Sequence, residues 1–141
     1  MDHLLTIALW LHLAAIGLGG SATFGIPVVG AVASLAPPEA RPHLALVGIK
    51  LSLMGRTALG ILIATGLLLV WGHYGLDGLR GWFWVKMVLV ALFTGLVIFS
   101  VKNGAKARAG DVAAAARAPL LGLAGIGLFL LIVLSAVLTF L

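Results

Sequence analysis

The stretch GWFWVKMVLVALFTGLVIFS (residues 81–100) decides the fold class, because it is apolar and long enough to cross a lipid bilayer. Its single charge is Lys86, near its start. The whole chain has the same character, since 62% of its 141 residues are hydrophobic and only 9% are charged. Soluble domains carry about 25% charged residues. The composition therefore predicts an integral membrane protein in contact with the lipid bilayer.

Four segments are long and apolar enough to form spanning helices, which need about 20 such residues. They cover approximately residues 4–34, 44–72, 82–101 and 119–141. The first can bend at Pro27, and the prolines of the first connection, LAPPEARPH, end helices. Pro119 suits the first turn of the fourth helix, where a missing N–H costs nothing. We expect an all-α fold, a single domain over residues 1–141 that forms a bundle of four transmembrane helices.

The distribution of basic residues predicts the orientation of the helices in the membrane. The side that holds the first and third connections carries seven of them: Arg41, Lys50, Arg56, Lys102, Lys106, Arg108 and Arg117. The opposite side carries only Arg80 and Lys86. Basic loops favour the cytoplasm, so we expect both termini on the outer side. The aromatic residues Trp10, Trp71, Tyr74, Trp82 and Trp84 fall toward that side, as an interfacial belt does.

Small residues recur at helical spacing and predict close contacts between the helices. They are Ala15, Gly19 and Thr23 in the first segment, Gly60 and Ala64 in the second, and Ala118 and Gly122 in the fourth. A compact bundle follows. The leucine and valine faces that remain are free for lipid, for a second copy of the chain or for a larger membrane complex.

Two polar residues lie inside spanning segments of the outer leaflet, His12 and Lys86. Intramembrane histidines face a bundle interior or a cavity, so His12 is either a metal or haem ligand or the donor of an interhelical hydrogen bond. Lys86 either extends its ammonium to the headgroups or pairs with an anionic ligand such as a porphyrin propionate. Acidic residues are absent from the spanning segments, which favours a ligand over an internal salt bridge.

His73 closes the second segment and is a further candidate for the same pocket. Pairs of histidines on separate helices hold b-type haem in bundles, but His73 lies at the surface while His12 lies about 12 Å deep. Other classes are excluded. The chain has no cysteine, no histidine and carboxylate cluster with zinc spacing, and too few basic residues for nucleic-acid binding.

Several of these residues resemble HemJ-type protoporphyrinogen oxidases and the related CopD-like membrane proteins. The likeness spans WLH in the first segment, Pro27 fifteen residues after His12, the Gly66 region, GWFWVKM and SVKNGAKARAG. The resemblance implies a four-helix protein of the bacterial inner membrane that binds haem b. His12 is then the counterpart of the family's first-helix histidine, and Lys86 and Trp82 correspond to its third-helix lysine and to the tryptophan before it. In the family, the histidine and the lysine are associated with haem and with oxidation of the porphyrinogen.

Three functions are consistent with the sequence. The first is an oxidoreductase that binds haem b or a porphyrin in the outer half of the bundle, with His12 as the iron ligand, Lys86 as the catalytic residue, and Trp82 and His73 beside the cofactor. The second is a CopD-like copper-handling protein, although methionines are few. The third is a non-enzymatic subunit or assembly factor of a larger membrane complex.

Overall fold

The computed structural model describes residues 3–74 and 81–140 and confirms the all-α four-helix bundle. The helices are α1 (His3–Leu35), α2 (Arg41–Leu69), α3 (Gly81–Arg108) and α4 (Val112–Phe140), and α2 continues as a π-helical turn, η1 (Val70–Tyr74). Each of the four helices is long and apolar enough to cross a membrane. The chain is therefore a multi-pass membrane protein.

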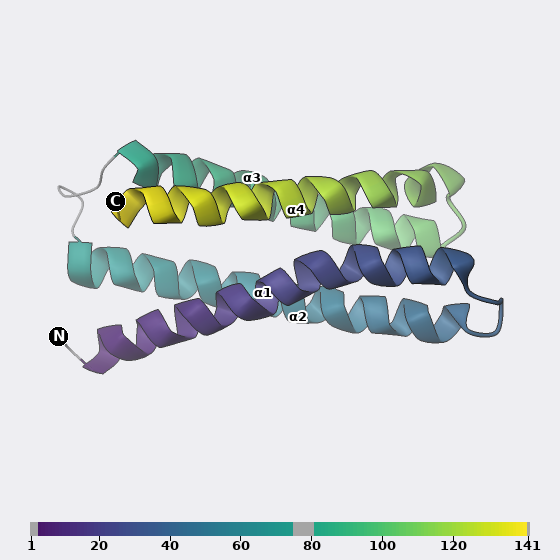
Figure 1. The fold of residues 1–141 in the computed structure, drawn as a ribbon, viewed down its shortest axis with the longest axis horizontal. Coiled ribbons are helices and arrows are strands. Elements are labelled where there is room, and N and C mark those ends of the chain that lie inside the picture. The colour runs from purple at the N-terminus through teal and green to yellow at the C-terminus, as the bar shows by residue number, and fades with distance from the viewer. Residues whose placement is uncertain (1–2, 75–80, 141) are drawn as a thin grey trace.

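The bundle consists of two antiparallel hairpins that lie side by side (Figure 1). Helix α1 packs along α2, and α3 packs along α4. The two hairpins are joined mainly by contacts between α1 and α4, whereas α2 and α3 hardly touch. The α1–α2 and α3–α4 connections lie at one end of the bundle, and the two chain termini lie toward the other. Packing is thus close within each hairpin and loose between them.

Small residues bring α1 and α2 together in a fixed antiparallel register. A Cβ atom at Gly55 would lie only 2.9 Å from the Cβ of Ala22, and one at Gly19 would lie 3.6 Å from the Cβ of Ala58. Such close backbone approach is how membrane helices associate, because lipid provides no hydrophobic force between them. The expected face of α1 is correct, but that of α2 is wrong. Gly60 and Ala64 are exposed, and Gly60 has open space where its side chain would be.

Two interlocking contacts join the hairpins near mid-bundle. The ring of Phe129 in α4 inserts at Gly20, where a Cβ atom would lie 3.1 Å from it. The ring of Pro27 in α1 sits against Gly122, where a Cβ atom would lie 2.9 Å from it. Helix α1 continues through Pro27, and its two halves run in different directions in Figure 1.

Helix α3 extends past the expected boundary at residue 101, and α4 begins before residue 119. The cause is a short corner around Gly110, whose positive φ of 98° follows the last turn of α3. The N–H groups of Gly110 and Asp111 donate to the carbonyls of Ala107 and Lys106, which is a Schellman ending. Asp111 then caps α4 by accepting a hydrogen bond from the Ala114 N–H (3.1 Å).

This corner also corrects the interpretation of Pro119. The residue lies inside α4, not in its first turn. A proline in a helix interior leaves one backbone carbonyl without its usual N–H partner. Membrane helices tolerate this where neighbouring groups or local adjustments satisfy the carbonyl. Asn103 fixes the same region from α3, since its buried side chain donates to the Ala114 carbonyl (2.8 Å).

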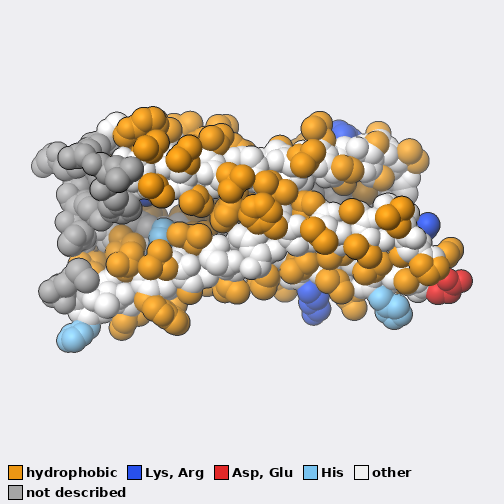
Figure 2. Space-filling view, viewed as in Figure 1, with side chains coloured by type: hydrophobic (Ala, Val, Ile, Leu, Met, Phe, Trp, Pro, Cys, Tyr) orange, Lys and Arg blue, Asp and Glu red, His pale blue; other side chains and the backbone are white. Residues whose placement is uncertain are grey.

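The surface of the bundle is apolar and the buried residues are mostly small. Alanines at positions 8, 15, 22, 58 and 114 are buried, while large leucines, valines and isoleucines are exposed on all four helices. Hydrophobic side chains cover both hairpins in Figure 2, and the visible basic and acidic side chains lie mostly toward the end with the α1–α2 and α3–α4 connections. An apolar surface of this extent suits a lipid environment. Trp10 and Trp71 are among its most exposed members.

The register of α1 and α2 predicts opposite effects for two alanine substitutions in α2. Gly55→Ala should destabilise the protein by about 1–3 kcal/mol, because the new methyl group overlaps the Ala22 methyl on a rigid neighbouring helix. Gly60→Ala is the matched control, and it should be neutral or stabilising by up to about 1 kcal/mol. Thermal unfolding in detergent measures both. Equal stability of the two variants would show that this register is wrong.

Candidate functional site

His12 lies in the contact between α1 and α2, where it meets Thr65. Its Nδ1 atom lies 2.8 Å from Thr65 Oγ1. His12 precedes Gly19 by seven residues and Thr65 follows Ala58 by seven, so this pair is two helical turns along the same seam from the Gly19–Ala58 contact. Thr65 is only 7% exposed. The packing of the hairpin therefore determines where the imidazole ring sits.

The hydrogen bonds of Thr65 also determine which nitrogen of His12 is available. The Thr65 hydroxyl donates its single proton to the carbonyl of Ile61, at 2.6 Å. With its proton on this carbonyl the hydroxyl accepts from the imidazole, and we therefore assign the ring proton to Nδ1, which donates. In the neutral ring, Nε2 then has a free lone pair. This is the tautomer in which Nε2 can ligate a metal or accept a proton.

Gly66 provides room for the imidazole ring beside Thr65. A Cβ atom at Gly66 would lie 3.4 Å from Cε1 of His12 and 3.9 Å from Nδ1. A larger side chain at this position would compete with the ring for space. Between Thr65 and Gly66, α2 thus provides both a hydrogen-bond partner and a flat contact for His12.

His12 lines a cleft of about 1790 Å³ between the two hairpins. All four helices contribute to its lining, which is mostly apolar. Small-molecule pockets in proteins usually measure about 300–1,000 Å³, so the cleft is larger than most. It results from the loose packing between the hairpins, since they are held together mainly along α1 and α4.

Lys86 lines the same cleft. Its ammonium lies 5.2 Å from the centre of the Phe83 ring, within the range of a cation–π contact. Phe83 is buried at one turn's distance on α3, and Lys86 is half-buried beside it. The acidic side chains that the structure describes, Glu39 and Asp111, belong to the connections at the opposite end of the bundle. Within the described chain, therefore, aromatic carbon rather than a carboxylate is beside this ammonium.

Of the other two sequence candidates, the structure describes the side chain of Trp82 alone. Trp82 is 48% exposed and does not line the cleft. Its neighbours Phe83 and Trp84 do, and their rings meet edge to face with centroids 5.6 Å apart. His73 belongs to η1, and its side chain lies outside the described part of the structure.

Aromatic rings also line another part of the cleft. Phe129 packs edge to face on Phe24 (6.1 Å between centroids) and lies 6.4 Å from Phe93. Phe93 is seven residues beyond Lys86 on α3, which corresponds to about 10 Å along the helix. The cleft is therefore lined by Phe93 and Phe129 further along the bundle from the His12–Lys86 end.

Two residues of this site, Thr65 and Phe83, were not expected from the sequence. Thr65 could be identified from its position seven residues after Ala58, on the same face of α2. This requires that the register of α1 and α2 is already known. Phe83 lies three residues before Lys86, one helical turn away. In the described residues, no three histidine, cysteine, aspartate or glutamate side chains gather as a metal site. The donor set that the structure shows for a metal is the single imidazole.

The comparisons with known proteins identify no relative. No family model matches the chain, and neither the curated proteins nor the solved structures contain a match. The geometry around His12 and Lys86, together with the resemblance of the sequence motifs, is therefore the basis for a functional assignment.

Proposed function

We propose that the His12–Lys86 end of the cleft binds haem b or a related porphyrin and that the protein is a HemJ/CopD-like oxidoreductase. The observation that carries this proposal is the hydrogen bond between His12 and Thr65, which leaves Nε2 of the imidazole unprotonated beside a large apolar cleft. A single histidine is sufficient to hold haem iron, as it does in globins and peroxidases. The residues present thus fit a haem ligated by one imidazole.

The remaining residues suit the other parts of a porphyrin. The macrocycle is flat and apolar, and Phe83 and Trp84 offer aromatic surface at this end of the cleft. Lys86 offers a positive charge for a propionate, or a proton-transfer group beside the ring of a porphyrinogen substrate. A bound haem supplies one-electron redox chemistry. The chain itself supplies the ligand, the counter-charge and the exclusion of water, and protoporphyrinogen oxidation is the reaction that the motif resemblance favours.

The cleft favours this proposal over a copper-handling role. A copper site needs several soft ligands close together, and the cleft is lined by His12 and by Met87. A copper ion also needs far less volume than the cleft provides. Metal analysis of the purified protein distinguishes the two. Co-purification with a partner and no bound cofactor would instead support the subunit or assembly-factor role.

We also propose that the protein lies in a bacterial inner membrane with both termini outside. Seven of the nine lysines and arginines lie in the half of the bundle that ends in the α1–α2 and α3–α4 connections. Basic loops are retained in the cytoplasm. His12 and Lys86 then face the outer leaflet, where the aromatic residues Trp10, Trp71, Trp82 and Trp84 are exposed.

Haem binding predicts a Soret absorption band that depends on His12. The protein purified in detergent, alone or after addition of haemin, should show this band, and His12→Ala should lose most of it because the iron ligand is gone. His43→Ala is the matched control, since His43 is an exposed histidine near the start of α2, far from the His12–Lys86 end of the cleft. This variant should retain the band. Absence of the band from the native protein after haemin addition would refute haem binding.

Removal of the Thr65 hydroxyl should weaken haemin binding without removing the ligand. Thr65→Val keeps the shape of the side chain but leaves Nδ1 without its acceptor, so the affinity should fall about 10–100-fold, as for other groups that orient a metal ligand. Thr57→Val is the control, because the Thr57 hydroxyl donates only to the Leu53 carbonyl on the exposed side of α2. Titration by absorbance measures both, and equal affinities would contradict the orienting role.

The proposed orientation predicts the accessibility of introduced cysteines, because the natural chain has none. In intact spheroplasts, a membrane-impermeant thiol reagent should label His3→Cys, at the start of α1. It should label Glu39→Cys, in the α1–α2 connection, only after the membrane is permeabilised. The reverse pattern would place the termini in the cytoplasm.

A further inference from the structure

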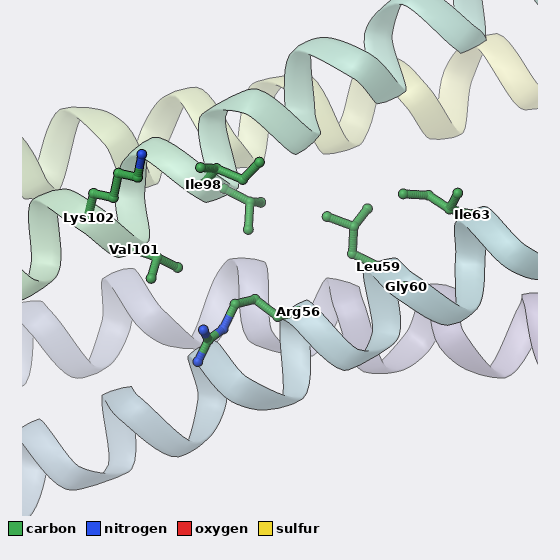
Figure 3. Close-up of a pocket in the computed structure, with 8 residues that line it drawn as sticks. Arg56, Leu59, Gly60, Ile63, Ile98, Val101 and Lys102 are labelled. Atoms are coloured by element: carbon green, nitrogen blue, oxygen red, sulfur yellow. The ribbon is translucent and has the colours of Figure 1, made fainter.

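A second, smaller groove of about 370 Å³ lies between α2 and α3, toward the end with the α1–α2 and α3–α4 connections. Figure 3 shows its walls, formed by Leu59 and Ile63 of α2 and by Val101 and Ile98 of α3. Gly60 contributes no side chain, and the space above it is open. The groove is distinct from the His12–Lys86 end of the cleft, because it contains neither of those residues.

Two basic side chains, Arg56 and Lys102, line this apolar groove. Both come from the same half of the groove in Figure 3, while Ile63 marks the other half. Both side chains are exposed. The Arg56 Nε–H donates to the carbonyl of Ser52 (3.4 Å), which leaves the two terminal nitrogens of the guanidinium for another acceptor. The groove thus has a cationic end and an apolar body.

No carboxylate is close in sequence to compensate these charges. Helices α2 and α3 contain no acidic residue along their whole lengths. The chain has only four acidic residues, and those within the described ranges, Glu39 and Asp111, belong to connections. Arg56 and Lys102 are exposed basic side chains beside an apolar wall, and clustered basic groups next to a membrane surface attract anionic headgroups. The arrangement therefore calls for an anionic partner from outside the chain.

The shape of the groove indicates what kind of anion fits. Helices α2 and α3 hardly touch, and in a bilayer the space between them must be filled by lipid or by protein. An α-helix is about 10 Å wide with its side chains, too wide for a groove of this volume. An alkyl chain fits along Gly60 and the side chains beside it. A molecule with an alkyl chain and an anionic head can therefore bind both the apolar body and the cationic end of the groove.

We propose that this groove is a binding site for an anionic phospholipid. The phosphate binds at the end of the groove that Arg56 and Lys102 line, and one acyl chain follows the seam between α2 and α3. Basic pockets between transmembrane helices on the cytoplasmic side bind the headgroups of such lipids, and the site lies in the leaflet that the proposed orientation places there. Because Arg56, Leu59 and Ile63 also line the large cleft, the lipid chain covers one side of it.

Native mass spectrometry of delipidated protein tests the proposal, with dioleoyl phosphatidylglycerol and dioleoyl phosphatidylcholine as probes. The native protein should prefer the phosphatidylglycerol. Arg56→Gln combined with Lys102→Gln should reduce this preference roughly thirtyfold, as expected for two basic residues at an anionic surface. The control, Lys50→Gln with Arg117→Gln, removes two exposed charges that do not line the groove and should keep the preference.

Two further measurements distinguish a lipid site from misfolding of the variant and from a general anion site. Arg56→Lys combined with Lys102→Arg keeps both charges, so it should retain the preference and shows that the glutamine variant does not act by misfolding. Inorganic phosphate at the same concentration should not displace the lipid, and displacement would mean that the pair is a general anion site. Equal binding of the two lipids by the native protein, or an equal loss in the Lys50/Arg117 control, would overturn the proposal. None of these measurements depends on haem.

Discussion

The close approach of α1 and α2 is the constraint on which the rest of the structure depends. In a bilayer, apolar side chains gain nothing by leaving lipid, so two helices associate most readily where small residues let their backbones come near. Glycine on one helix opposite a methyl-bearing residue on the other provides this at Gly19–Ala58 and Gly55–Ala22. The same register then brings His12 to Thr65. The polar pair is consequently held by packing that extends well beyond it.

Contacts between the hairpins are few, and this leaves the interior open. Phe129 at Gly20 and Pro27 at Gly122 join α4 to α1, but nothing comparable joins α2 to α3. The resulting cleft has two chemically different ends. His12 and Lys86 provide an imidazole and an ammonium at one, and Arg56 and Arg108 provide guanidinium groups at the other. A bundle with uniformly close packing would have no space for either set to meet a ligand.

The number of helices and their approximate spans could be predicted from the sequence, because they follow from the length and polarity of each segment. The α3–α4 corner was missed, although Gly110 and Asp111 are standard signals for a helix end and a helix start. The long apolar run beginning at Pro119 concealed the first two turns of α4, which are rich in alanine and more weakly apolar.

The rotation of each helix could not be predicted, for a physical reason. A spanning helix is apolar on all sides, so its sequence has no polar face that indicates which residues point inward. The expected contact face of α2, at Gly60 and Ala64, is therefore wrong, whereas Gly19 on α1 is correct. The expectation that Trp82 lies beside the cofactor meets the same difficulty of helix rotation. Trp82 is exposed, whereas its neighbour Phe83 is buried. One residue along a helix is a rotation of about 100°.

The hydrogen bonds from His12 to Thr65 and from Thr65 to the Ile61 carbonyl form a continuous chain that runs from one helix into the backbone of the next. Linked donors polarise one another. Any cation that takes the free lone pair of the imidazole makes its Nδ1–H a stronger donor and strengthens both links. Occupancy of this lone pair would thus tighten the α1–α2 hairpin, so that the empty and the occupied protein differ in how firmly the two helices are held together.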